Sequence, residues 1–369
     1  MDQHVTAGAM QSQPSAHLRW VHPSGLISLS FANYMLSIVT LGIYSFWGKT
    51  EVRKRLWSAI RLDGEPLLYT GTGKELFLGF LFVFFLVLLP IMLLTFAAAY
   101  LLGPQSVGAA LFNIALYILI FFLVGVAIYR ATRYRLSRTR WRGIRGALVG
   151  SPTRYAFFYF WTLPLLILSL GWLSPWRTTK LQSMLINDMR FGDRPFRFSA
   201  SPGPLYSRFA VIWFAGLAIA VLAGGVMAHL IGSEVATNIE NDPTQKISVT
   251  TILTVYGIVL LGFLLYGIAS AWYYSFKFNY FSRNTHFEGA TLRADLTGPG
   301  LIWLTISNLL ITIFSLGILS PVTQARTMRY VIQRMGFVGS PRFSEIAQSA
   351  EQDIRLGEGL AQAFDIDAF

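Results

Sequence analysis

Asn33, Thr162 and Asn308 stand in otherwise apolar stretches, each nine residues before the glycine of a recurring Leu-Gly pair. If these stretches lie in a membrane, such a side chain either hydrogen-bonds a neighbouring helix or lines a cavity that holds a solute. Both interpretations are open at this point. The candidate site consists of these residues and the small polar or glycine positions around each pair: Asn33, Thr40, Gly42, Ser45, Thr162, Ser169, Gly171, Ser174, Asn308, Ser315, Gly317 and Ser320.

Other chemistry that would indicate an enzyme is missing from the sequence. The five histidines (His4, His17, His22, His229 and His286) do not cluster at metal-ligand spacing. The absence of cysteine excludes disulfides and thiolate metal sites. A nucleophile with a neighbouring base is not recognisable either. We therefore expect no catalytic residues, no metal and no cofactor.

The Leu-Gly pair belongs to a longer motif with a fixed context. A Thr or Ser precedes each Leu, and a Pro follows each Gly by 24 positions, at Pro66, Pro195 and Pro341. Such constant spacing indicates one supersecondary unit used three times. The three copies are Leu41-Gly42-Ile43-Tyr44-Ser45, Leu170-Gly171-Trp172-Leu173-Ser174 and Leu316-Gly317-Ile318-Leu319-Ser320.

Composition places these motifs in an integral membrane protein. Of 369 residues, 54% are hydrophobic and only 13% charged, whereas a soluble domain carries roughly 25% charged residues. Four long apolar segments, 76–102, 107–129, 205–231 and 247–275, predict transmembrane helices. The fold class we expect is all-α and polytopic, with these four helices in two hairpins.

The three motifs lie in shorter apolar cores, 26–47, 155–176 and 301–320, each followed by a basic amphipathic helix and a short cytoplasmic β-turn element. If these cores crossed fully, seven spans would place basic segments on both sides, against the positive-inside rule. If each core instead turns at its Leu-Gly, every basic segment faces the cytoplasm. We therefore prefer broken or re-entrant cores, with full crossing as the alternative. An even number of crossings between copies would make the internal repeat parallel.

The basic residues near these boundaries are most simply contacts to anionic lipid headgroups on the cytoplasmic face. Nucleic acid is excluded as a partner, because the positive charge, +12 in total, is tied to membrane boundaries. Whether another membrane protein or a second copy binds is left open. The candidate lipid contacts are Arg53, Lys54, Arg55, Arg133, Arg138, Arg140, Arg142, Arg145, Arg177 and Lys180.

The triple motif, the basic helix after it and the turn Arg61-Leu62-Asp63-Gly64-Glu65-Pro66 resemble the YjgN family of bacterial inner-membrane proteins, over about residues 18–345. The third copy departs most, with Val322 in place of an aromatic residue and Gln324 in place of Lys. The resemblance implies a multi-pass inner-membrane protein of uncharacterised activity, and it supplies no site residues.

The domain organisation we expect has an N-terminal tail (1–17), two membrane repeats (18–153 and 154–299), a half-repeat (300–345) and an acidic C-terminal tail (346–369).

The sequence is compatible with two functions. Broken cores around a common axis favour a transporter-like or channel-like protein, with a site where Gly42, Gly171 and Gly317 approach one another. Uncharged spans and a broad basic face favour a lipid-binding scaffold that interacts with another envelope protein.

Overall fold

The computed structural model describes residues 18–103, 105–241, 247–339 and 341–347. The predicted N-terminal tail, and the C-terminal tail beyond residue 347, lie outside this part of the chain. The described residues form two compact units. One comprises the described residues within Met1–Ala200, Phe281–Asp295 and Asn308–Phe369, and the other those within Ser201–Tyr280 and Leu296–Ser307. The limits of these units differ from the predicted repeat boundaries.

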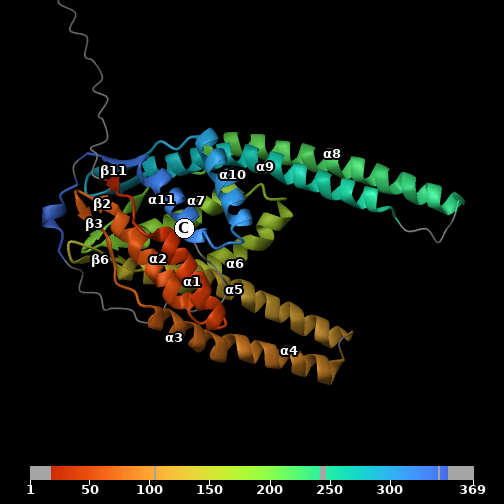
Figure 1. Cartoon of the computed structure of the whole chain (residues 1–369), viewed down its shortest axis with the longest axis horizontal. Coiled ribbons are helices and arrows are strands. Elements are labelled where there is room, and N and C mark those ends of the chain that lie inside the picture. Colours follow the sequence, from red (N-terminus) through yellow and green to blue (C-terminus); the bar gives the residue numbers. More distant parts are fainter. Residues whose placement is uncertain (1–17, 104, 242–246, 340, 348–369) are drawn as a thin grey trace, which may run out of the picture. The chain divides into compact units, whose positions relative to one another are not determined.

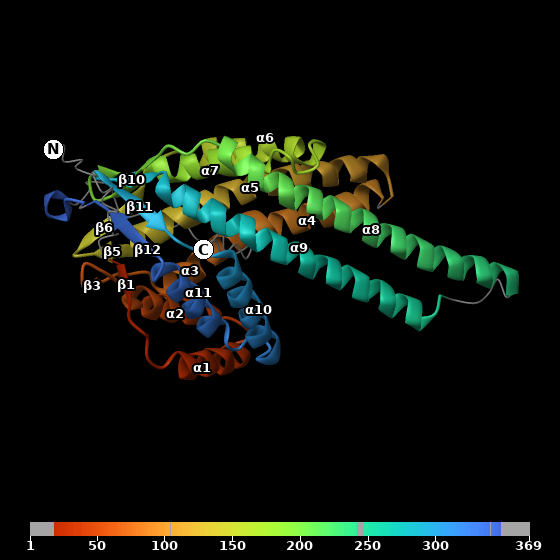
Figure 2. The same cartoon turned by 90° about the horizontal axis from the view of Figure 1, so that it is seen from above.

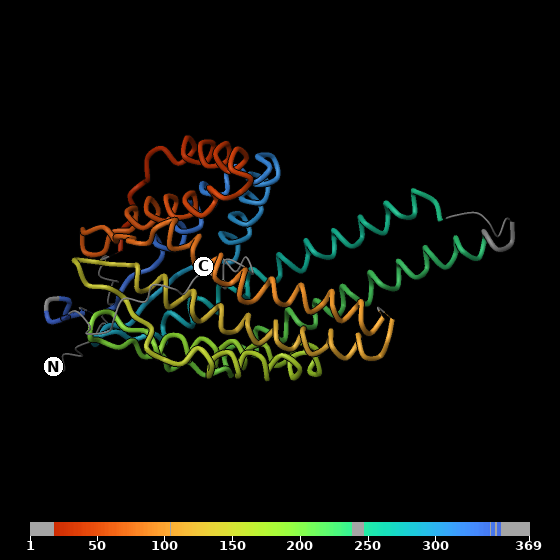
Figure 3. Tube along the Cα trace, turned by 90° about the horizontal axis from the view of Figure 1, so that it is seen from below, coloured from red at the N-terminus to blue at the C-terminus, as the bar shows by residue number. Residues whose placement is uncertain are grey.

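In the described part of the chain, four apolar helical segments are long enough to cross a membrane, as expected for a polytopic membrane protein: Gly73–Leu102, Val107–Arg138, Gly203–Thr237 and Val249–Arg283. The first consists of α3 (Gly73–Val83), a π-helical turn (Phe84–Leu88) and α4 (Leu89–Leu102). The π turn immediately precedes Pro90, whose missing N–H breaks the α-helical hydrogen-bond ladder. Helix α5 (Val107–Arg138) runs back beside α4, as the trace in Figure 3 shows.

The second unit is built around α8 (Gly203–Asn241) and α9 (Val249–Arg283), which run side by side in Figure 2. Both helices are longer than the apolar segments predicted, because polar residues continue the helix. Residues 232–241, which follow the predicted apolar segment, are helical, whereas 242–246 lie outside the described residues. The span Val107–Tyr129 likewise continues as helix through the basic residues to Arg138.

Each apolar core contains a short helix, and a second helix that carries basic residues follows the Leu-Gly turn. The pairs are α1 (Leu26–Val39) and α2 (Ser45–Ala59), α6 (Pro152–Leu168) and α7 (Ser174–Asp188), and α10 (Gly298–Phe314) and α11 (Ser320–Ile332). We call these pairs the first, second and third hairpins. Pro164 lies inside α6 without ending the helix. Figure 1 shows α1 and α2 side by side, in red and orange.

The short β elements form more extensive sheets than the β-turns predicted. All pairings are antiparallel, and they give sheets ordered β1-β2-β3, β4-β5-β6-β7-β8 and β12-β11-β10-β9. The strands span Leu18–Trp20 (β1), Ile60–Leu62 (β2), Glu65–Pro66 (β3), Leu68–Tyr69 (β4), Thr139–Trp141 (β5), Ile144–Leu148 (β6), Met189–Phe191 (β7), Arg194–Pro195 (β8), Arg197–Phe198 (β9), Thr285–Phe287 (β10), Ala290–Ala294 (β11) and Met335–Val338 (β12).

Cores of the first unit join the hairpins to their neighbours. Leu26 of α1 and Val52 and Leu56 of α2 pack with Ala325 of α11. The second hairpin uses α5 instead, because Tyr155 and Leu181 pack with Tyr129 of that helix. The first hairpin therefore lies against the third, whereas the second lies against a long apolar helix.

Candidate functional site

The three Leu-Gly turns have the same backbone conformation. Leu41, Leu170 and Leu316 have φ values of 50°, 49° and 51°, and the glycines that follow have φ values of 90°, 84° and 82°. Each glycine N–H donates to the carbonyl five residues back, at 2.7, 2.7 and 2.8 Å. Each leucine N–H donates to the carbonyl three residues back. This pair of bonds is a Schellman helix end, with Leu at the position that glycine usually takes.

Hydroxyl side chains complete each turn. The Oγ of Thr40, Ser169 and Ser315 accepts from the backbone N–H four residues ahead, at 2.9, 3.2 and 3.2 Å. The same hydroxyls donate back to a carbonyl of the preceding helix. These residues therefore serve the turn itself.

The tips of the turns present apolar side chains outward. Leu41, Leu170 and Leu316 are 94%, 76% and 83% exposed. A β-carbon added at Gly42, Gly171 or Gly317 would meet no atom within 4 Å. The side of each glycine on which a β-carbon would stand therefore faces open space.

The polar residues inside the cores tie the two helices of each hairpin together. The Asn33 amide donates to the Gly48 carbonyl at 3.4 Å, and the Asn308 amide donates to the Thr323 carbonyl at 3.4 Å. In the second hairpin, Arg177 donates to the Thr162 hydroxyl at 2.9 Å. Each bond joins residues fifteen apart across the turn. Helix–helix hydrogen bonding is thus the structural role of all three.

The second hairpin is closed by the Arg177 side chain. Its Nη2 also donates to the Tyr159 carbonyl at 3.1 Å, and its guanidinium carbon lies 4.5 Å from the centroid of the Tyr159 ring. Tyr159 and Arg177 lie twelve residues before and six after Gly171. The residues at the same distances from Gly42 are Ser30 and Gly48. The first hairpin therefore has two small residues where the second has two large ones.

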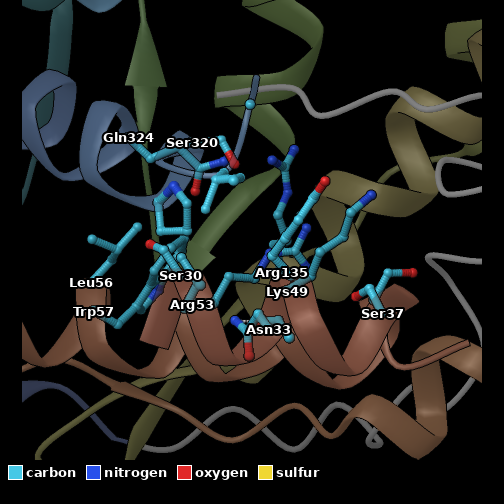
Figure 4. A pocket seen from close by; sticks show the side chains of 17 residues that line it. Ser30, Asn33, Ser37, Lys49, Arg53, Leu56, Trp57, Arg135, Ser320 and Gln324 are labelled. Carbon is cyan, nitrogen blue, oxygen red and sulfur yellow. Dashed lines mark hydrogen bonds between the residues drawn. The ribbon is translucent and has the colours of Figure 1, made fainter. Parts of the chain in front are cut away.

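A cavity of ≈390 Å³ opens along the first hairpin, where α1 and α2 meet the third turn and α11. In Figure 4, Ser320 and Gln324 enter it from α11, on the opposite side from Asn33 and Leu56. Helix α5 contributes Arg135. Its remaining lining residues are Ser30, Tyr34, Ser37, Ser45, Gly48, Lys49, Val52, Arg53, Trp57, Gly317, Ile318 and Pro321.

The cavity brings together part of the predicted site. Asn33 and Ser45 of the first hairpin line it, as do Gly317 and Ser320 of the third. The other predicted site residues are not in its lining: Thr40, Gly42, Thr162, Ser169, Gly171, Ser174, Asn308 and Ser315. The site is therefore shared by the first and third hairpins, and the second contributes none of its lining.

Several lining residues were not singled out from the sequence. Ser30, Asn33 and Ser37 follow one another at positions i, i+3 and i+7, which places them on one face of α1. On a helix that is otherwise apolar, a row of polar residues indicates a face that contacts water or forms hydrogen bonds. Lys49 and Arg135 were read only as parts of basic segments, because nothing local indicates that they meet.

Some cations predicted to bind lipid have partners inside the protein. Arg138 is 7% exposed, and its Nε lies 3.1 Å from the carboxylate of Glu75. The Tyr134 hydroxyl donates to the same carboxylate at 2.7 Å. Arg138 is thus enclosed by protein, and Glu75 supplies the opposite charge that a cation excluded from water needs. It is not placed to meet a headgroup.

Other predicted lipid contacts hold nearby protein groups. Arg133 and Arg55 donate to backbone carbonyls, Arg133 to that of Gly150. Arg53 donates to the Tyr69 hydroxyl, Lys54 pairs with Glu51, and Arg142 lies over the ring of Trp141 and near Asp63. Among the ten, Lys54, Arg142 and Lys180 are exposed, whereas Arg140 and Arg145 are partly buried.

Comparison with known proteins places these features in a family. The inner membrane protein YjgN of Salmonella typhimurium is 26% identical over 140 residues, which are 38% of this chain and 32% of that protein. The matched region thus spans about a third of the length of this relative. No solved structure matches. The family described as "Bacterial protein of unknown function (DUF898)" matches residues 23–363, nearly the whole chain, which therefore belongs to that family.

Proposed function

We propose that this chain is a transporter-like protein of the bacterial inner membrane that binds a solute in the cavity between its first and third hairpins. The observation that carries the proposal is the cavity itself, a space of ≈390 Å³ lined by polar and apolar side chains next to two helix breaks. Small-molecule sites are concave and of about 300–1,000 Å³. Broken helices at a repeat interface are where secondary transporters bind their substrates.

The topology that goes with this function is four spans and three hairpins that enter and leave on the cytoplasmic side, as parallel copies of one unit. Helix α1 has 14 residues and α6 and α10 have 17. At a rise of about 1.5 Å per residue they reach about 21 and 26 Å, less than the roughly 30 Å of a hydrocarbon core. Apolar leucines at the turn tips suit immersion in lipid, and the backbone groups there are bonded within each turn.

A second function, a lipid-binding scaffold on the cytoplasmic face, is favoured by one observation. Lys180 is exposed, and so are Lys54 and Arg142, although these two also lie near Glu51 and Asp63. Basic residues near the surface each contribute about 1 kcal/mol toward an anionic leaflet. A scaffold needs this surface but does not need access to the cavity from both sides of the membrane.

Thiol labelling separates the two functions, because the chain lacks cysteine. Ser37→Cys and Gln324→Cys lie in the cavity lining, and Met35→Cys on the exposed apolar face of α1 is the matched control. A membrane-impermeant thiol reagent should label both cavity positions in right-side-out and in inside-out vesicles, and should spare Met35→Cys. Labelling from the cytoplasmic side alone would contradict transport and favour the scaffold. No labelling at either position would contradict a solute site.

A further inference from the structure

The lining of the cavity carries positive charge from two elements. Lys49 and Arg53 lie on α2, and Arg135 lies on α5, so the cations come from two helices. The described lining contains no aspartate or glutamate. Arginine presents a planar fork of N–H donors that matches the oxygens of phosphate and carboxylate, whereas lysine supplies a compact charge. The lining thus favours an anion.

The start of helix α2 adds to this preference. Helix α2 begins at Ser45, which lines the cavity, and no side chain caps it. The N-terminus of a helix carries a partial positive charge, and it therefore favours phosphate or another anion. Ser320 of α11 also lines the cavity, but its N–H and that of Val322 donate to the turn carbonyls, and Pro321 has no N–H. Three cations and one helix start suit a dianion better than a single carboxylate.

An apolar part of the lining continues from the charged part. Along α2 the sequence of lining residues is Lys49, Val52, Arg53, Leu56 and Trp57, all on one helix face. Ile318 and Pro321 add apolar surface from the third hairpin. A ligand that fills this space needs both a charged head and an apolar body.

We propose that the cavity binds a phosphate monoester carried on an apolar body, and this proposal rests on the proposed function because it names the solute class for the same site. The dianionic head would meet Lys49, Arg53 and Arg135, and the body would lie against Leu56 and Trp57. The same chemistry occurs in a lysophospholipid from the membrane and in a water-soluble alkyl phosphate.

Isothermal titration calorimetry on the full chain in phosphatidylcholine nanodiscs tests the class directly. The probes are hexyl phosphate, hexanoate and hexanol, which share the alkyl chain and differ in charge. Hexyl phosphate should bind at least tenfold more tightly than hexanoate, and hexanol should not bind measurably. Equal affinity for hexyl phosphate and hexanoate, or no binding of hexyl phosphate, would overturn the proposal.

Variants of the cavity lining test whether hexyl phosphate binds in the cavity. Lys49→Gln/Arg53→Gln should weaken hexyl phosphate at least tenfold, whereas Arg61→Gln, on the exposed strand β2, should change affinity less than twofold. Ser30→Tyr should also weaken binding tenfold, because it fills the cavity without removing a cation. Size-exclusion chromatography and circular dichroism should show both lining variants folded. Folded variants that bind like the unaltered protein would place the ligand elsewhere and contradict the assignment.

Lysophosphatidic acid in place of hexyl phosphate identifies the source of the ligand. Tighter binding of the lysolipid, lost with Lys49→Gln/Arg53→Gln, supports the proposal with the membrane as the source, and tighter binding of hexyl phosphate supports it with water as the source. Failure of both phosphates together with two-sided labelling of Ser37→Cys would overturn the ligand class and leave the solute site in place. Failure of the labelling would overturn the proposed function.

Discussion

The first and second hairpins are built on the same turn, yet one borders a cavity and the other is filled. Both have a Schellman end with a left-handed leucine, and both tie their helices together fifteen residues apart. In the second hairpin, Arg177 lies across Tyr159. In the first, Ser30 and Gly48 take these positions and line the cavity, with Asn33 packed closely against Gly48. The turn thus sets the geometry of a hairpin, and two side chains decide whether space remains within it.

Removing the side chains of Tyr159 and Arg177 from the second hairpin should have the largest effect on stability. Tyr159→Ser/Arg177→Gly deletes a ring contact and two charge-assisted hydrogen bonds. We expect the free energy of unfolding to fall by about 3 kcal/mol, because cavity formation and the loss of such bonds each cost more than about 1 kcal/mol. Denaturant unfolding followed by tryptophan fluorescence measures it. A fall of less than 1 kcal/mol would show that Arg177 does not hold this hairpin closed.

The reverse exchange should close the first hairpin. Ser30→Tyr/Gly48→Arg places the two large residues of the second hairpin at the same distances from Gly42. Labelling of Ser37→Cys by the impermeant reagent should slow at least tenfold, equivalent to about 1.4 kcal/mol in access. The rate at which the reagent labels the exposed Arg61→Cys serves as the reference. An unchanged rate at Ser37→Cys would contradict the role given to these two side chains.

Substitution of the turn glycine should destabilise the two hairpins equally. Gly42→Ala and Gly171→Ala introduce no clash, because an added β-carbon meets nothing within 4 Å. The positive φ of each glycine is unfavourable for alanine, so each change should lower the free energy of unfolding by about 1 kcal/mol. A much larger loss in one hairpin would show that the turns differ in their surroundings.

Loss of the turn hydroxyl should have the smallest effect. Thr40→Val and Ser169→Ala remove the acceptor for the backbone N–H of Tyr44 and Leu173. Each should cost about 0.5–1 kcal/mol of unfolding free energy, the net value of one such hydrogen bond. Thr254→Val provides a control, since its hydroxyl bonds only within α9. A loss no larger than the control would mean that the hydroxyls do not support the turns.

Much of the fold could be predicted from the sequence, because length and hydropathy determine where a helix is apolar enough to span. The four long helices and the breaks at Gly42, Gly171 and Gly317 follow from that pattern. The sheets were underestimated, since strands of two to five residues carry little periodicity and pair with distant partners, as Leu68 does with Arg140.

The site was predicted only in part for a related reason. Asn33 and Ser320 were visible as polar residues beside the motif, whereas the contribution of Arg135 depends on how α5 packs against the first hairpin. The difference between Gly48 and Arg177 was present in the sequence, but its consequence is steric and appears only in three dimensions. Burial of Arg138 beside Glu75 likewise depends on the packing of α5 against α3.

Topology mapping by single cysteines tests the central claim, that each hairpin returns to the side from which it enters. Cysteines replace exposed residues after each hairpin or span: Arg61, Arg142, Arg190, Arg283 and Gln333, with Gln105 between α4 and α5 and Ser233 near the end of α8. In right-side-out vesicles, an impermeant reagent should label only Gln105→Cys and Ser233→Cys, and inside-out vesicles should show the reverse. Labelling that alternates along the series of five would mean that the cores cross the membrane, and would contradict the account.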